Sequence, residues 1–306
     1  MRRPDLAGLV PAIVTPMNDD FTVDFAALER YVEWVVAQGP AAIAVNTDAG
    51  EGPHLSREEK RRILAAVVGW VGGRVPVVSG VGAPATADAV ELAGEARDLG
   101  ADAILCFPIT AFRGATGKDP VIIAYHEALA SVGVPMILFT LQPDLGGVDY
   151  PPETLAELVR LDPVVAIKEA TFDALAFQRT KALLHSLEKR ITLLTGNDNF
   201  ILESFILGAD GALIGFGAIA TEMQVKMIAA VKAKDYETAF KLNETLAPLA
   251  DVMFARPVRD YRARLKEGLR LQGVLPRATV RPPLLPLDAE GARRVREAME
   301  KGGLLP

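Results

Sequence analysis

The sequence contains few of the residues on which metal and disulfide chemistry depend. Its 306 residues include one cysteine, Cys106, and three histidines, His54, His126 and His185. A single cysteine excludes an internal disulfide framework and a cysteine-based zinc site, and Cys106 is most simply a small core residue at a strand end. The three histidines are too scattered to match a metal-ligand spacing. We therefore expect no metal and no other cofactor.

The chain also lacks long apolar runs and an excess of basic charge. No uninterrupted apolar stretch approaches the ~20 residues that a membrane helix needs. The first stretch, MRRPDLAGLVPAIVTP, is broken by Pro11 and Pro16 and carries no signal-peptide cleavage pattern. The formal net charge of -6 provides no basic field for nucleic acid. These features predict a cytoplasmic protein that binds neither membranes nor nucleic acids.

Strand-like runs alternate with helical ones from residue 9 onward, the pattern of βα units around a parallel sheet. Eight strands are expected, at residues 9–16, 41–46, 75–80, 101–108, 135–141, 164–170, 191–198 and 211–217. Helical spacing in 24–39 ends at Gly39, and Ser56 with Glu59 forms a capping box for the next helix. Eight units predict a closed (β/α)8 TIM barrel, because an open doubly wound sheet would usually have fewer strands and a phosphate-binding glycine turn.

The chain is longer than the barrel requires. Such barrels reach about 250 residues as one domain, so one large domain with an extension fits the 306 residues. We assign residues 1–222 to the barrel and 223–306 to an all-helical C-terminal extension packed on it. Helices are expected at about 223–234, 236–254, 258–272 and 288–301, the last after a proline-rich link.

The stretch most informative about function is 164–170, VVAIKEA. Period-two alternation places Lys168 on the same strand face as Val164, Ala166 and Ala170. Burying an unpaired ammonium is costly, so the pKa of such a lysine falls, and the neutral amine can attack a carbonyl carbon to form a Schiff base. The alternative is a lysine that reaches solvent from the strand end or pairs with a carboxylate.

Small and polar residues are expected around this amine, because the carboxyl ends of barrel strands carry the active site. These ends and the loops after them contain Thr15, Asp48, Gly50, Ser79, Thr140 and the turn 196–198. For each hydroxyl alone, capping the following helix is the alternative, and the turn 196–198 could merely cap a helix that begins at Asn199. Taken together, these groups favour a catalytic Lys168.

Motifs along nearly the whole chain resemble those of the dihydrodipicolinate synthase and N-acetylneuraminate lyase family. The matching stretches are 11–16, 50–51, 167–171, 196–198, 216–220 and 281–284. Members of that family are barrels with a C-terminal helical extension that form a Schiff base between a lysine and a 2-oxo acid. The resemblance implies that Lys168 is the Schiff-base lysine and that the chain forms a homotetramer, a dimer of dimers. We assign substrate binding to Ala49, Gly50, Thr140, Gly196 and Leu213.

Several positions depart from the family pattern. Family members usually carry Gly-Thr-Thr-Gly-Glu after the second strand, where the threonines hold the substrate carboxylate and join a proton relay, whereas this chain has Asp48 at the first threonine. The relay tyrosine of strand five aligns with Phe139, and the loop tyrosine after strand four aligns with Thr110. Asp144 stands where dihydrodipicolinate synthases carry an arginine for the second substrate. These departures argue against authentic dihydrodipicolinate synthesis.

Asp48 is the group that we expect to take over proton transfer, because phenylalanine cannot carry a proton. A carboxylate that approaches Lys168 directly would raise the pKa of the lysine and oppose the effect of burial. The alternative is that Asp48 caps the second helix. His54, in the loop after strand two, could also reach the mouth of the barrel.

Two functions are therefore compatible with the sequence. The first is a lyase that forms a Schiff base through Lys168 with a 2-oxo acid, by aldol cleavage or condensation or by dehydration of a deoxy sugar acid. The second is a catalytically retired barrel that binds or regulates small molecules, which the lost carboxylate contacts favour and the retained lysine opposes.

Overall fold

A computed structural model describes residues 3–305, except for the side chain of Asp144. It contains eight parallel strands: β1 Leu9–Pro11, β2 Ile43–Val45, β3 Val77–Val81, β4 Ala103–Cys106, β5 Met136–Leu141, β6 Val164–Ala170, β7 Thr192–Thr195 and β8 Gly211–Ile214. From β2 to β8 each strand pairs with the next one in the chain, and β8 pairs with β1. The ring closes between β1 and β2 at a parallel bridge from Ala12 to Ala44, where the N–H of Ile13 donates to the carbonyl of Ala44 at 3.0 Å. The predicted TIM barrel is confirmed.

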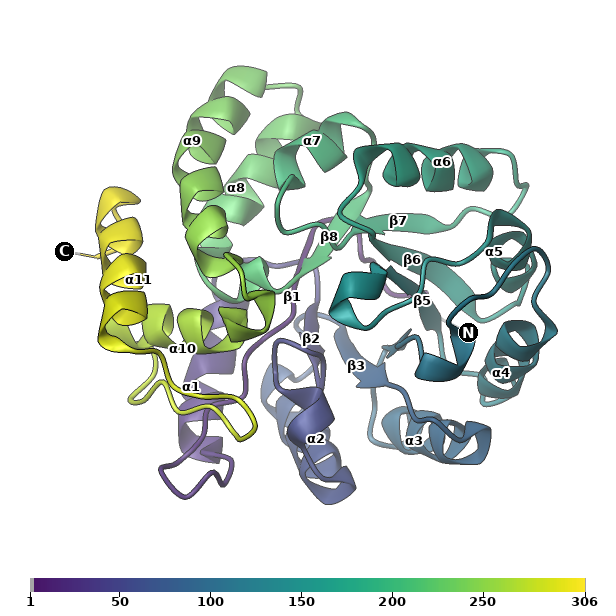
Figure 1. The fold of residues 1–306 in the computed structure, drawn as a ribbon, viewed down its shortest axis with the longest axis horizontal. Helices are drawn as coiled ribbons and strands as arrows, with labels where there is room; N and C mark the ends of the chain where they lie inside the picture. The colour runs from purple at the N-terminus through teal and green to yellow at the C-terminus, as the bar shows by residue number, and fades with distance from the viewer. Residues whose placement is uncertain (1–2, 306) are drawn as a thin grey trace.

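Helices surround the strands (Figure 1). Those that alternate with strands are α1 Phe25–Val36, α2 Arg57–Val71, α3 Thr86–Asp98, α4 Pro120–Ala130, α5 Pro152–Leu158, α6 Ala174–His185, α7 Ile201–Ile206 and α8 Thr221–Lys232. Three more follow, α9 Tyr236–Met253, α10 Tyr261–Leu271 and α11 Ala289–Lys301. Short 3-10 turns are η1 Gly52–His54, η2 Thr110–Phe112, η3 Pro143–Leu145, η4 Phe216–Ala218 and η5 Val258–Asp260.

Local sequence signals explain where these elements begin and end. Every residue of β4 and β8 is buried, as expected for parallel strands covered on both faces, and Cys106 is the buried last residue of β4. Asp24 caps α1 by accepting a hydrogen bond from the N–H of Ala27 at 2.9 Å. The predicted capping box of Ser56 and Glu59 is present at the start of α2.

Several strands are shorter than the sequence suggested. The apolar runs 9–16, 191–198 and 211–217 give strands of only three or four residues, because the chain then turns at the end of the barrel. The buried residues beyond these strands include Val14 and Phe216. Apolar runs therefore mark burial, and strand length follows from where the neighbouring strand ends.

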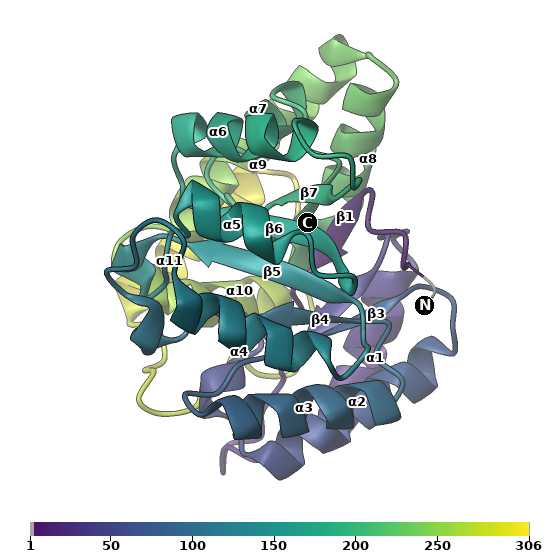
Figure 2. The same cartoon turned by 90° about the vertical axis from the view of Figure 1, so that its right-hand side faces the viewer.

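The C-terminal helices gather on one side of the barrel (Figure 1). α9 packs on α8 and α11, and α10 packs on α11. Figure 2 shows the arrowhead of β5 pointing toward the side on which α10 and α11 lie. α8 also contacts β1, and the division of the chain at residue 222 stays a prediction. None of the described helices is long and apolar enough to cross a membrane.

Candidate active site

A cavity of about 1030 Å³ lies at the carboxyl ends of the strands. Lys168 and Ala170 of β6 and Phe139 of β5 form part of its wall. The loops after β2 and β7 contribute further wall residues, and the segment 254–262 forms another side. Strand alternation therefore brings Lys168 into the barrel mouth, where residues from several loops converge on it.

Lys168 lies in a mostly apolar setting. Its Nζ is 4.2 Å from the centroid of the Phe139 ring. A Cβ atom on Gly196 would lie 2.7 Å from Cβ of Ala170 and 2.6 Å from Cε of Lys168, so a larger residue at position 196 would displace the lysine side chain. Burial lowers the pKa of Lys168 to about 8, although the charges of Asp198 and then Asp48 oppose the shift. A substantial neutral fraction of the amine is thus present near pH 8.

Asp198 is a cavity residue whose role the sequence left as a turn or cap. Its Oδ1 accepts a hydrogen bond from the N–H of Phe216 at 2.8 Å, and α7 has no side-chain cap. Burial raises the pKa of Asp198 to about 6, while the Phe216 hydrogen bond and the charge of Lys168 act in the opposite direction. The only sequence signal was a carboxylate shortly after a strand that neighbours β6.

The turn that carries Asp198 is held against β6 on the side that faces away from the cavity. Nδ2 of Asn197 donates to Oε2 of Glu169 at 2.7 Å, and Oδ1 of Asn197 accepts from the N–H of Phe172 at 2.7 Å. Glu169 follows Lys168 on the strand and so faces away from the cavity. Burial raises the pKa of Glu169. Glu169 and Asn197 are therefore positioning residues for Asp198.

Asp48 also lines the cavity, but its closest partners come from α10. Oδ2 of Asp48 accepts a hydrogen bond from the hydroxyl of Tyr261 at 3.0 Å, and Oδ1 forms an ion pair with Arg262. Nε of Arg262 donates to the carbonyl of Asp48 at 2.7 Å. We expected Asp48 to approach Lys168 directly, whereas it influences Lys168 through its charge and contacts Tyr261 and Arg262. Asp48 does not cap α2, because Ser56 does.

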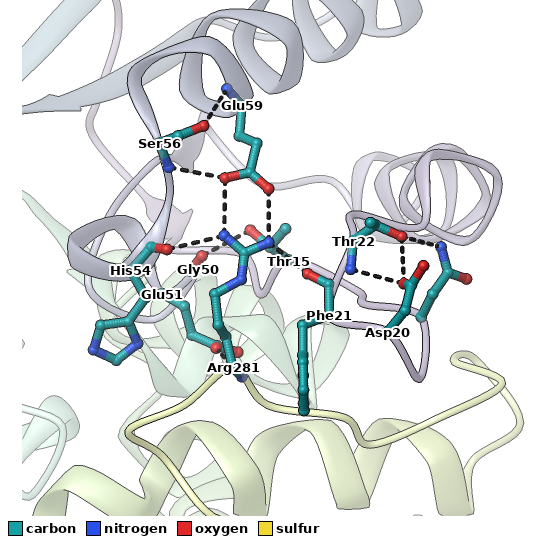
Figure 3. Close-up of polar contacts among 11 residues, drawn as sticks. Thr15, Asp20, Phe21, Thr22, Gly50, Glu51, His54, Ser56, Glu59 and Arg281 are labelled. Carbon is teal, nitrogen blue, oxygen red and sulfur yellow. Dashed lines mark hydrogen bonds and ion pairs between the residues drawn. The ribbon is translucent and has the colours of Figure 1, made fainter.

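The loop that carries Asp48 is anchored by the C-terminal segment (Figure 3). The fully buried carboxylate of Glu51 pairs with Lys266 of α10. The same carboxylate accepts a hydrogen bond from the N–H of Arg281 at 2.8 Å, and Figure 3 shows these two residues side by side. The φ angles of Asn46 and Glu51 are 57° and 59°, in the left-handed region that non-glycine residues rarely adopt. These contacts hold a locally strained turn in place.

Arg281 links the same loop to α2. Its guanidinium contacts the carboxylate of Glu59 at 2.6 and 2.8 Å and donates to the carbonyl of His54 at 2.9 Å. Figure 3 shows Glu59 making the capping box with Ser56 at the same time. His54 lies on η1 and its side chain is not part of the cavity wall, although its neighbour Pro53 is.

Four of the predicted site residues line the cavity, namely Lys168, Asp48, Ala49 and Gly196. Gly50, Thr140 and Leu213 do not. Gly50 lies beneath the turn, where its carbonyl accepts a hydrogen bond from Oγ1 of Thr15 at 2.8 Å. Gly50 therefore shapes the loop and does not face the cavity.

Thr140 and Leu213 are excluded from the wall by strand geometry. Phe139 occupies the inward face of β5, so Thr140 points outward, where its hydroxyl donates to Oδ1 of Asp149 at 3.1 Å. Leu213 lies in the middle of β8, fully buried and paired with Val10 of β1. Both placements depend on register and depth in the barrel, which apolar patterns do not specify.

Thr47 is a cavity residue that sequence reasoning missed. It precedes Asp48, and the residue is 2% exposed. Within residues 3–305, its buried hydroxyl has no hydrogen-bond partner. Buried polar groups are nearly always paired, so this hydroxyl is unusual, although its oxygen is itself buried and not exposed to the cavity. The threonine hydroxyls of the family pattern are absent, but one hydroxyl remains one position earlier.

The C-terminal segment contributes positively charged residues to the cavity wall. Arg256, Arg259 and Arg262 all line it, and the side chain of Arg259 is 74% exposed. Lys118, by contrast, forms a surface ion pair with Glu157 at 3.1 Å and is not a wall residue. The arginines make the mouth attractive to an anion.

The remaining departures from the family pattern can also be placed. The ring of Phe139 packs edge-on against Phe107, with centroids 5.1 Å apart. Thr110 is exposed on η2 and does not line the cavity. Asp144 lies in η3, and its side chain is outside the described part of the structure.

Comparison with known proteins identifies the family to which this geometry belongs. The model of the dihydrodipicolinate synthetase family matches residues 5–301. The chain belongs to this family. A 4-hydroxy-tetrahydrodipicolinate synthase of Saccharophagus degradans is 32% identical over 302 residues, covering 98% of this chain and 100% of the relative. One of Cellvibrio japonicus is 31% identical over 98% of this chain and 100% of its own length. Members of the family are lyases, and this chain is a lyase of the family.

Solved structures agree with the assignment. The dihydrodipicolinate synthase of Acinetobacter baumannii, solved with pyruvate, has a TM-score of 0.83 and 29% identity, covering 98% of this chain and 99% of that one. A monomeric dihydrodipicolinate synthase variant has a TM-score of 0.90 over 99% of both chains, at 24% identity. This second likeness concerns the fold alone.

Proposed function

We propose that this lyase forms a Schiff base between Nζ of Lys168 and the carbonyl carbon of a 2-oxo acid. The observation that carries the proposal is the Lys168 side chain, which ends in the cavity and whose pKa is lowered to about 8 by burial. The neutral amine adds to the carbonyl, and loss of water gives an iminium that accepts the electron pair of the adjacent C–H or C–C bond when it breaks. The presence of pyruvate in the Acinetobacter baumannii enzyme supports a pyruvate-type substrate.

Residues around the lysine have matching roles in this proposal. The backbone groups of Thr47 and Ala49, which both line the cavity, would hold the substrate carboxylate, and Gly196 leaves space for the lysine side chain. Asp48 would act in proton transfer, with its charge balanced by Arg262. No cofactor is required by this chemistry.

We further propose that the reaction is not dihydrodipicolinate synthesis but aldol cleavage or condensation, or dehydration of a deoxy sugar acid. Phe139 cannot relay a proton, and Asp144 replaces the arginine expected after strand five. Arg256 and Arg259 would attract an anionic substrate from a different side of the cavity. The homotetramer and the cytoplasmic location stay predictions.

Reductive trapping tests the proposed function. Wild-type protein incubated with pyruvate and borohydride should gain the mass of a reduced pyruvate adduct, located at Lys168 by peptide mapping. A panel of 2-oxo acids, including deoxy sugar acids, should then rank the substrates by trapping rate. If no member of the panel is trapped, the Schiff-base lyase is refuted and a small-molecule binding protein is favoured.

The pH dependence of trapping should report the charge around Lys168. The initial rate should rise with pH through about 8, because only the neutral amine attacks. Asp198→Asn should move the midpoint of this rise in rate to lower pH. The substitution removes the largest charge that favours the Lys168 ammonium, while Oδ1 can still accept from the N–H of Phe216. Asp98→Asn, in a surface ion pair with Arg97, is the matched control and should leave the midpoint in place. An Asp198→Asn midpoint equal to that of wild type would contradict the assigned coupling.

A further inference from the structure

The site needs a proton carrier that β5 does not provide. When the amine adds to a carbonyl, the oxygen must gain a proton, and a second proton must arrive before that oxygen leaves as water. Phe139 presents a bare ring 4.2 Å from Nζ of Lys168. The proton carrier must therefore come from another part of the wall.

Few groups in the described cavity wall can act as this proton carrier. The arginines stay protonated at any physiological pH. The pKa of Asp198 is about 6, so near pH 8, where the Lys168 amine becomes neutral, Asp198 is ionised and has no proton to donate. The two oxygens of Asp48 are bound by Tyr261 and Arg262, so Asp48 can exchange a proton with Tyr261 but has no free oxygen for the substrate. The hydroxyl of Thr47 is too weak an acid to be more than a hydrogen-bond donor or acceptor. Tyr261 is the remaining wall residue with an acidic O–H.

The ring of Tyr261 is held firmly in the cavity wall. It is 8% exposed and stacks on Phe254, with centroids 5.0 Å apart and planes inclined by 21°. A Cβ atom on Gly215 would lie 3.1 Å from Cε2 of Tyr261, so the glycine makes room for the ring. The hydroxyl donates to Oδ2 of Asp48 at 3.0 Å. A fixed ring and a paired hydroxyl are the properties of a preorganised proton donor.

The electrostatics agree with this geometry. Burial raises the pKa of Tyr261 well above its usual range, and the charges of Asp48 and Asp198 act in the same direction. The resting hydroxyl is therefore protonated. Asp48 and Asp198 also favour the ammonium of Lys168, so all four side chains share one electrostatic environment.

We propose that the hydroxyl of Tyr261 protonates the substrate carbonyl oxygen during Schiff-base formation, with Asp48 as its proton-exchanging partner. The inference rests on the proposed function of Lys168. The nitrogen lone pair forms the C–N bond, the carbonyl π pair moves to oxygen, and Tyr261 gives this oxygen its proton. The adduct nitrogen loses one proton, which returns to Tyr261 through Asp48. One further proton, taken up from solvent by the same route, leaves with the oxygen as water while the nitrogen lone pair forms the iminium.

The removal of one oxygen atom tests this role. Tyr261→Phe keeps the stack on Phe254 and the ion pair between Asp48 and Arg262, but it deletes the donor. The rate constant for pyruvate adduct formation should fall about 100-fold, while the pyruvate concentration that gives half the maximal rate changes little. Tyr31→Phe is the matched control. It removes a buried hydroxyl that donates to the carbonyl of Ala218 at 2.8 Å outside the cavity wall, and it should trap pyruvate at the wild-type rate.

A second variant separates chemistry from structure. Adding Phe139→Tyr to the Tyr261→Phe protein places a hydroxyl on the ring beside Nζ of Lys168 and should recover at least about tenfold in rate, which a merely structural loss would not permit. Equal rates in wild type and Tyr261→Phe would overturn the role, and so would a change confined to the half-maximal pyruvate concentration. Absence of any adduct in wild-type protein would refute the proposed function itself, and the role of Tyr261 with it.

Discussion

Lys168→Ala is expected to abolish the reducible pyruvate adduct, a loss of at least about 1000-fold in trapping rate. Lys168 is the only lysine in the described wall of the cavity, and the other cations there are arginines, which do not form Schiff bases because they remain protonated. The fold should survive, since the truncated side chain borders an existing cavity. The measurement is the mass of the protein after incubation with pyruvate and borohydride.

Lys60→Ala is the matched control for this experiment. Burial also lowers the pKa of Lys60, which lies on α2 and is not a wall residue. The Lys60 variant should be trapped as efficiently as wild type. Trapping of the Lys168→Ala protein at another lysine would show that the nucleophile has been misassigned.

Lys266→Met is expected to lower the free energy of unfolding by about 3 to 5 kcal/mol, because it leaves the buried carboxylate of Glu51 without its counterion. Neither side chain of this pair is exposed, and Lys266 also donates to the carbonyl of Thr279 at 2.7 Å. Urea unfolding followed by circular dichroism should show a lower midpoint. Adding Glu51→Gln should recover part of the loss, since the amide can still accept from the N–H of Arg281 without carrying a charge.

A surface pair provides the control for this stability prediction. Lys226 pairs with Glu222 at 2.7 Å, and the two side chains are 61% and 60% exposed. Lys226→Met should therefore cost less than about 1 kcal/mol. If Lys226→Met and Lys266→Met unfolded at the same urea concentration, the buried pair would not stabilise the anchored loop as we infer.

The fold could be predicted from the sequence because its signals are local. Most residues of the barrel strands are buried and apolar, and period-two alternation was sufficient to place Lys168 on the inward face of β6. Helix starts such as Ser56 with Glu59 depend on residues three positions apart and were predicted correctly. Strand ends were less predictable, because they depend on the neighbouring strand.

The part of the site that α10 contributes could not be predicted, because it depends on long-range packing. Tyr261 contacts Asp48 across 213 positions of sequence, and Arg262 does so across 214. No periodicity in α10 indicates which of its residues will face a loop of the barrel. Thr140 was assigned to the cavity although alternation places it outward, opposite to Phe139.

The wall of the cavity comes from two different parts of the chain. The part of the wall that contains Lys168 belongs to the strands. Another part consists of the segment 254–262, which follows all eight strands in the chain. Changes in this segment can alter which carbonyl compound is admitted, and which group exchanges protons with it, while β6 stays unchanged. The barrel can thus keep one nucleophile while its C-terminal residues diverge toward different substrates.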